Sequence, residues 1–92
     1  MEFQKQRELY VEVAKQHLHN YGTYTYSDHI VDIIVSVMMT RDGVMQGGSF
    51  VQAIVNNDLR GAISRADGDC TNHLRVIALA HPFAFVEQLD YK

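Results

Sequence analysis

The histidines and the single cysteine are the residues of this 92-residue chain with the greatest capacity for chemistry. His29 and Asp32 are three positions apart, as are Cys70 and His73, and Asp69 precedes His73 by four. Side chains at these spacings share one face of a helix. Zinc needs three or four ligands, and each pair supplies only two. We therefore expect no bound metal and no cofactor.

Cys70 could act as a nucleophile with His73 or His81 as its base. A position at the N-terminus of a helix would lower the pKa of the thiol and activate it. However, Cys70 begins the apolar face of the segment that follows, and cysteines in that setting are usually buried and unreactive. The sequence therefore predicts a protein that is not an enzyme.

The glycine pair Gly47-Gly48 could belong to a loop that binds phosphate. Such loops place their glycines in a GxGxxG pattern or before GKS or GKT, and neither pattern is present here. The glycines are followed by Ser49-Phe50-Val51-Gln52, which has the Ser-x-x-Gln form of a helix capping box. We interpret the glycines as a turn that leads into a capped helix.

The charge balance excludes an ordinary binder of duplex DNA. Eight Lys and Arg residues against eleven Asp and Glu residues give a formal net charge of −3. Most of the affinity of duplex binders comes from a concentrated basic surface. A helix-turn-helix could be fitted to residues 50–66, but its second helix would offer only Arg60 and Arg65. We expect no binding to free duplex DNA.

Composition predicts one soluble intracellular domain over residues 1–92. The hydrophobic fraction of 47% and the charged fraction of 21% are typical of a globular protein. One cysteine cannot form an internal disulfide, which fits a reducing cytosol. No apolar run is long enough to cross a membrane, and the first residues lack the pattern of a signal peptide. We expect no membrane partner.

Two long helices are expected in the first half of the chain. Residues 2–20 lack Gly and Pro and repeat large apolar residues at intervals near four, and Gly22 is suited to end this helix. The second helix, 28–40, begins at the capping residues Ser27 and Asp28. Its Ile and Val residues would also suit a strand, but its polar residues fall four apart, at Asp28, Asp32, Ser36 and Thr40, which favours a mostly buried helix.

Three shorter helices are expected in the second half. The first spans 50–56, with Asn57 in a left-handed conformation after it, and Asp58 caps the next. A further helix runs from Cys70 to His81 and is stopped by Pro82. The apolar faces are predicted at Leu59, Ala62, Ile63 and Ala66, and at Cys70, Leu74, Ile77, Ala78 and His81. The fold class is therefore all-α, a compact bundle of four to five helices. Residues 23–26 and the tail, 82–92, could each be a short extended segment, and the tail could also be a last helical turn.

Three tyrosines near the start of the second helix are candidates for a contact surface. Tyr21, Tyr24 and Tyr26 lie beside Asp28 and His29 in the sequence. Tyrosine supplies rigid contact area with a polar tip, which suits protein interfaces and stacking on unpaired bases. Equally, one or two of these rings could fill the core beside the first helix.

The run "GGSFVQAIVNNDLRGAISRAD", residues 47–67, carries a resemblance. Its order of Gly-Ser-Phe, Ala and Val, Asn-Asp-Leu, Ala, and Arg-Ala-Asp is similar to a run in small proteins of bacteriophages and other mobile elements. The resemblance covers roughly residues 28–77. Taken whole, with its amphipathic first helix and its length, the sequence resembles a phage-encoded anti-CRISPR protein directed against the type I-F surveillance complex. It departs from the commoner form in its long first helix, in the turn at residues 67–70 and in its Phe-rich tail.

The resemblance implies an inhibitor that works by obstruction. Such proteins bind the complex that Cas protein subunits form with the guide RNA, and they prevent target DNA from pairing. Their expected partners are the Cas protein subunits, and contact with the guide RNA itself is left open. The expected location is the cytoplasm of the infected bacterial host. The alternative is a small phage regulatory protein that binds another host protein or nucleic acid.

The expected contact residues form two groups, each with a chemical rationale. Asp28 and Asp32 could pair with Lys or Arg of the partner, and Arg60 and Arg65 could reach phosphates or acidic side chains. The first group lies around the second helix and contains Tyr24, Tyr26, Asp28, His29 and Asp32. The second lies at the helix hairpin and contains Asn56, Asn57, Arg60 and Arg65.

Overall fold

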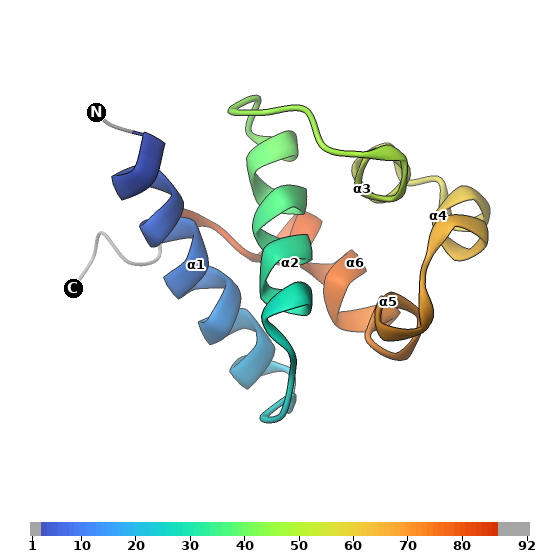
Figure 1. Ribbon diagram of the computed structural model, residues 1–92, viewed down its shortest axis with the longest axis horizontal. Helices are drawn as coiled ribbons and strands as arrows, with labels where there is room; N and C mark the ends of the chain where they lie inside the picture. The colour runs from blue at the N-terminus through green and yellow to red at the C-terminus, as the bar shows by residue number, and fades with distance from the viewer. Residues whose placement is uncertain (1–2, 87–92) are drawn as a thin grey trace.

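A computed structural model describes residues 3–86 of the chain. It confirms the all-α fold class: these residues form helices and no strand (Figure 1). There are six helices rather than four or five: α1 (Phe3–Asn20), α2 (Asp28–Arg41), α3 (Ser49–Val55), α4 (Leu59–Arg65), α5 (Gly68–Asn72) and α6 (Leu74–Phe83). Within 3–86, no helix has both the length and the apolar character needed to cross a membrane.

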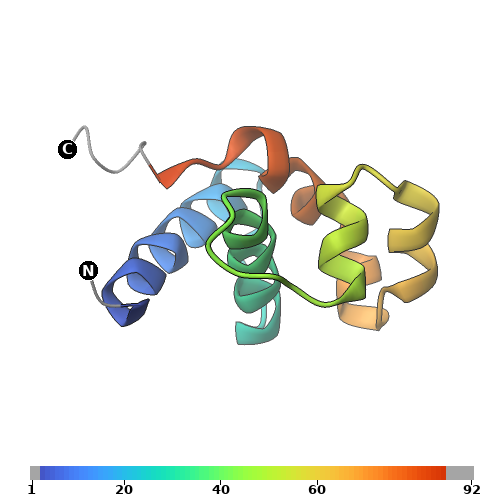
Figure 2. The same ribbon diagram turned by 90° about the horizontal axis from the view of Figure 1, so that it is seen from above.

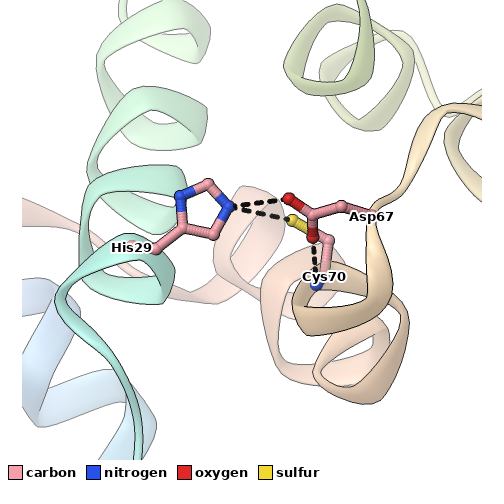
Figure 3. Close-up of side chains that lie close together, drawn as sticks. All are labelled: His29, Asp67 and Cys70. Carbon is pink, nitrogen blue, oxygen red and sulfur yellow. Dashed lines mark hydrogen bonds and ion pairs between the residues drawn. The ribbon is translucent and has the colours of Figure 1, made fainter.

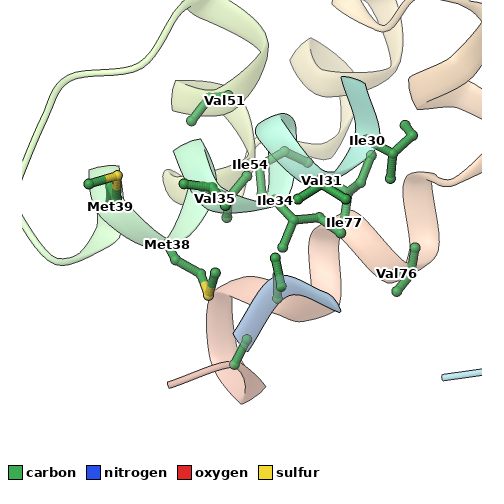
Figure 4. Close-up of a cluster of buried hydrophobic side chains, with 14 of the residues drawn as sticks. Ile30, Val31, Ile34, Val35, Met38, Met39, Val51, Ile54, Val76 and Ile77 are labelled. Atoms are coloured by element: carbon green, nitrogen blue, oxygen red, sulfur yellow. The ribbon is translucent and has the colours of Figure 1, made fainter. Parts of the chain in front are cut away.

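The central element is α2, which contacts α1, α3 and α6, while α4 packs on α3 at one end of the molecule (Figures 1 and 2). The polar side predicted for α2 is confirmed, because Asp28 and Asp32 are exposed and Ser36 and Thr40 are only partly buried. The rest of the helix supplies much of the core (Figure 4), namely Ile30, Val31, Ile34, Val35, Val37, Met38 and Met39.

The expected end of α1 and the expected start of α2 are also confirmed. Gly22 follows α1 with a φ of 80°, in the left-handed region that glycine adopts without strain. The hydroxyl of Ser27 accepts a hydrogen bond from the amide of Ile30 and so caps the start of α2. Between these two residues the chain forms a connection, not a strand. Apolar residues of α1, including Tyr10, Ala14 and Leu18, are buried at the predicted spacing.

The predicted capping box of α3 is wrong. Gly48 occupies the N-cap position without a side-chain hydrogen bond, because α3 begins one residue earlier, at Ser49. Gln52 Nε2 instead donates to the carbonyl of Gly47, at 2.9 Å. Glycine is required at position 47, because a Cβ atom on Gly47 would stand only 2.6 Å from Val51 Cγ1. The glycine therefore permits a close approach between the loop and α3.

The apolar face predicted for α4 is present, but most of it is not buried. Asn57 adopts a φ of 60° and Asp58 caps Gly61, as expected. Of the four face residues, however, only Ala62 is buried, whereas Leu59 is 59% exposed and Ile63 is 55% exposed. Among residues 3–86, α4 packs chiefly on α3, and the side that carries Leu59 and Ile63 is left open to solvent.

The predicted fifth helix is two helices, α5 and α6, that meet at His73. The His73 Nδ1 lies 3.0 Å from the carbonyl oxygen of Asp69, and this local hydrogen bond competes with continuation of the helix. Pro82 does not stop α6 at once, since the helix extends through it to Phe83. Residues 84 and 85 are not helical, and the expectations for residues 87–92 lie outside the part of the chain described.

A buried histidine joins α1 to α6. His17 is 4% exposed, and its Nε2 lies 2.8 Å from the carbonyl oxygen of Val76, to which the neutral ring donates. Burial lowers the pKa of His17 and outweighs the hydrogen bond to Val76, which raises it. The ring is therefore favoured in its neutral form in the folded state.

This lowered pKa predicts that His17 makes stability depend on pH. The unfolded chain takes up the proton more readily, so this contribution is present above about pH 6.5 and is lost as the pH falls below that value. We expect the free energy of unfolding of the wild type to fall between pH 7.5 and pH 5.5 by more than that of His17→Gln, measured by urea denaturation. A difference between the two proteins that does not change with pH would contradict this assignment.

Candidate functional site

Three side chains of complementary chemistry meet where α2 faces α5. His29 lies in the first turn of α2, Asp67 is the N-cap of α5, and Cys70 lies within α5. The His29 Nε2 is 3.0 Å from Asp67 Oδ2 and 4.0 Å from Cys70 Sγ. All three ligand-type atoms lie within 4.8 Å of one another, and the side chains point toward a common centre (Figure 3).

The capping of the two helices holds this cluster in place. Asp67 Oδ1 accepts a hydrogen bond from the backbone amide of Cys70 at 2.8 Å, which leaves Oδ2 directed at His29. Ser27, the N-cap of α2, donates its hydroxyl to Asp69 Oδ2 at 2.7 Å. The starts of both helices are therefore fixed against each other by side chains that also cap them.

The electrostatics of the cluster do not favour a nucleophilic thiol. The backbone amide of Cys70 lowers the pKa of Asp67, and His29 lowers it further. Burial raises the pKa of Cys70 to about 11, and the Asp67 carboxylate adds to this rise. The thiol is therefore protonated at neutral pH, which is the opposite of the activation that catalytic cysteines require.

Slow alkylation of Cys70 is the expected consequence. Relative to a reference pKa of 9.0, a pKa of about 11 leaves about 100-fold less thiolate at pH 7. With EDTA present, we expect iodoacetamide to label the folded protein about 100-fold more slowly than a cysteine in an unstructured peptide. Mass spectrometry of timed samples measures this rate, and the urea-unfolded chain serves as the control. Labelling of the folded protein at the peptide's rate would disprove the assignment.

The structure divides the tyrosines near α2 between the surface and the core. Tyr24 is 68% exposed and packs edge-on against the ring of His19, with 4.7 Å between the ring centroids. Tyr26 is partly buried and packs against the core, as does Tyr21. Of the two tyrosines expected to contact a partner, Tyr24 is the better placed.

The charged residues expected in the same group differ in how far they are already engaged. Asp28 is exposed. Asp32 is exposed but forms an ion pair with Arg7 of α1, at 2.6 Å. His29 contacts Asp67, which lies 38 residues further along the chain. The pairing of His29 with Asp32, three positions apart in the sequence, does not reveal this contact. The residues that meet His29 are thus Asp67 and Cys70, whereas the sequence paired the cysteine with His73 or His81.

The expected contact residues of the helix hairpin lie on the surface. Asn56, Asn57, Arg60 and Arg65 are all exposed. Arg65 donates to the carbonyl of Gly61, at 3.1 Å, within α4 itself. Asn57 also lines a groove between the α3–α4 hairpin and α6. This hairpin is therefore the part of the expected contact surface that borders a concave feature.

The groove is mostly apolar and has a volume of about 470 Å³. Leu59, which lines it, projects from the first turn of α4, and Ile63 is exposed one turn further along the same helix. The sequence placed both residues on the predicted apolar face of this helix. Three segments line the groove: Ala53 and Ile54; Asn57, Asp58 and Leu59; and Ala78, Leu79, His81 and Pro82. We call the groove together with Ile63 the α4–α6 face.

The chain matches no model of a known protein family, no curated protein and no solved structure.

Proposed function

We propose that this protein is a phage-encoded inhibitor that binds the crRNA-guided type I-F surveillance complex and sterically blocks target DNA binding. The observation that carries the proposal is the α4–α6 face, where a groove opens beside the exposed side chains of Leu59 and Ile63. The choice of partner rests on the sequence resemblance of residues 28–77. The face supports a mode of action in which the protein binds a larger surface and occupies it.

Exposed aliphatic side chains beside a groove are suited to anchor a partner. Full burial of one such side chain contributes about 1.5–3 kcal/mol, and a few buried anchors supply most of the affinity of many interfaces. The apolar centre at Leu59 and Ile63 lies among polar residues of the same hairpin, including Asn57, Arg60 and Arg65. An apolar centre with a polar rim is the usual anatomy of a protein interface.

Obstruction requires contact area rather than chemistry. A standard interface buries about 800 Å² on each partner, which would be about one seventh of the accessible surface of 5650 Å². The net charge of −3 favours approach to a basic channel that guides nucleic acid, although apolar anchors provide the main force. The protonated thiol of Cys70 agrees with a function that needs no nucleophile.

The alternative is a small phage regulatory protein that binds another host protein or nucleic acid. An apolar groove with exposed Leu59 and Ile63 would serve any protein partner of matching shape, so the face alone does not select the surveillance complex. The partner must be tested directly.

Size-exclusion chromatography of the protein mixed with purified type I-F surveillance complex tests the proposal. We expect the protein to elute with the complex at a fixed ratio that excess protein does not increase. Separate elution at micromolar concentrations of both components would reject the proposed partner. Specific recovery of a different host protein by the immobilised chain would then favour the alternative.

A further inference from the structure

We propose that His29, Asp67 and Cys70 together bind one Zn²⁺ ion. This inference does not depend on the proposed function, because it concerns the isolated chain. It also goes beyond the pairs visible in the sequence, since the three ligands come from the first turn of α2, the N-cap of α5 and the body of α5.

The ligand chemistry selects zinc among the common metals. An imidazole nitrogen, a thiolate sulfur and a carboxylate oxygen are the three donor types found in zinc sites. Calcium and magnesium prefer oxygen donors throughout, and this cluster offers one carboxylate. A nitrogen and a sulfur donor at the same point therefore favour a transition metal, with zinc the best match to the mixed set.

The separations are close to those of a tetrahedral site. Bonds of about 2.0 Å to nitrogen and oxygen and about 2.3 Å to sulfur place tetrahedral ligands about 3.3–3.6 Å apart. The His29 Nε2 stands 3.0 Å from Asp67 Oδ2 and 4.0 Å from Cys70 Sγ, so these distances bracket the required values. The widest separation in the cluster stays within 4.8 Å.

The surroundings allow the site to adjust and to admit an ion. The side chains of His29 and Asp67 are 48% and 58% exposed, so both can move toward a common centre and an ion can enter from solvent. Cys70 is buried behind them, which places the sulfur on the protein side of the site. The backbone amide of Cys70 already orients Asp67, as outer hydrogen bonds do for metal ligands.

Binding would exchange the thiol proton of Cys70 for the ion and release that proton to solvent. Three protein ligands leave a fourth position for water on the exposed side. The ion would join α2 to the start of α5. In the described fold these two helices are held together here by the hydrogen bonds Ser27–Asp69 and His29–Asp67. Zinc should therefore raise the melting temperature of the chain by mass action.

Titration with Co²⁺, a spectroscopic substitute for zinc, tests the site. We expect one Co²⁺ per chain, with a thiolate-to-cobalt charge-transfer absorption in the near ultraviolet that zinc abolishes by competition. Cys70→Ser should remove this absorption. Because that change affects a buried residue, two variants of exposed ligands give independent evidence: His29→Gln and Asp67→Asn, the second of which keeps an N-cap residue.

Loss of a ligand should weaken zinc binding by at least about 10-fold, since removal of outer partners alone costs that much. His19→Gln, which removes an exposed histidine of α1, is the control and should keep the wild-type affinity. The proposal is overturned if the wild type binds no zinc at micromolar concentration. It is overturned equally if His29→Gln and Asp67→Asn bind as tightly as the wild type, or if His19→Gln loses as much affinity as they do.

Discussion

Replacement of Leu59 by glutamate should weaken binding of the protein to the type I-F surveillance complex by at least about 100-fold. The Leu59 side chain lines the groove of the α4–α6 face and is 59% exposed in the free protein. In the proposed complex this position is covered by the partner, so Leu59→Glu would remove an apolar anchor and bury a charge in its place. Losses of about 2.8 kcal/mol, equivalent to 100-fold, are typical of anchor residues.

The effect should be confined to binding. Leu59 is the first residue of α4, where a negative charge interacts favourably with the helix dipole, so the helix is expected to form. Gln16→Glu adds the same charge to an exposed position of α1 and serves as the matched control. Surface plasmon resonance measures both affinities, and circular dichroism checks the helix content. If Leu59→Glu binds as tightly as Gln16→Glu, the α4–α6 face is not the contact surface.

Replacement of Arg41 by alanine should lower the free energy of unfolding by about 3 kcal/mol, the largest stability effect that we expect. Arg41 Nη1 donates to three carbonyl oxygens at the end of α6, those of Ala80, His81 and Ala84. Its Nε and Nη2 atoms bind both oxygens of Asp42, at 2.7 and 3.0 Å. The Arg41 side chain thus supplies hydrogen-bond donors both to carbonyl oxygens at the C-terminus of α6 and to the carboxylate of Asp42.

The loss follows from the groups left behind. The last carbonyls of a helix lack partners within it, and burial without a donor is costly. The carbonyl of Ala80 keeps a bond from the amide of Ala84, whereas those of His81 and Ala84 lose the donor that Arg41 supplies. Burial raises the pKa of Asp42, but hydrogen bonds from Arg41 and Tyr10 outweigh it and hold that pKa below its usual value. Among the described contacts, Arg41→Ala would leave this carboxylate with the hydroxyl of Tyr10 as its donor, and it would also remove the guanidinium from above the Phe85 ring.

Urea denaturation at pH 7 measures the effect. Arg65→Ala is the control, because Arg65 is exposed and bonds only within α4 among the described contacts; it should change stability by less than about 0.5 kcal/mol. Arg41→Lys should recover part of the loss, since one ammonium group can reach a carbonyl but cannot also bind both oxygens of Asp42. Equal stabilities for Arg41→Ala and Arg65→Ala would show that the contacts of Arg41 contribute nothing.

Local patterns were enough to predict α1 and α2. In α1, a long run without Gly or Pro was combined with apolar residues at helical spacing, and Gly22 marked the end. In α2, polar residues four apart outweighed the strand preference of Ile and Val. In a strand, alternate residues share one face, so Asp32 and Ser36 would lie on the same face as the buried Ile34. These signals depend only on neighbours along the chain.

Features that depend on distant segments were not predictable in the same way. Leu59 and Ile63 have the spacing of a core face, but spacing does not tell whether another helix covers that face. At the break at His73, the carbonyl of Asp69 is bonded by the His73 side chain, while the His73 backbone amide bonds to Cys70, and no periodicity records such a contact. His29 meets Asp67 and Cys70 only because the fold brings the first turn of α2 beside the start of α5, about forty residues further along the sequence.

Binding of target DNA by purified type I-F surveillance complex, titrated with this protein, is the most direct test of the account. If the protein acts by occupying the surface that DNA must reach, DNA binding falls to background once the protein matches the number of its sites on the complex. The target DNA itself remains intact, and smaller amounts of protein inhibit only in proportion. Full DNA binding in the presence of saturating protein would contradict the account, as would complete inhibition by a trace amount.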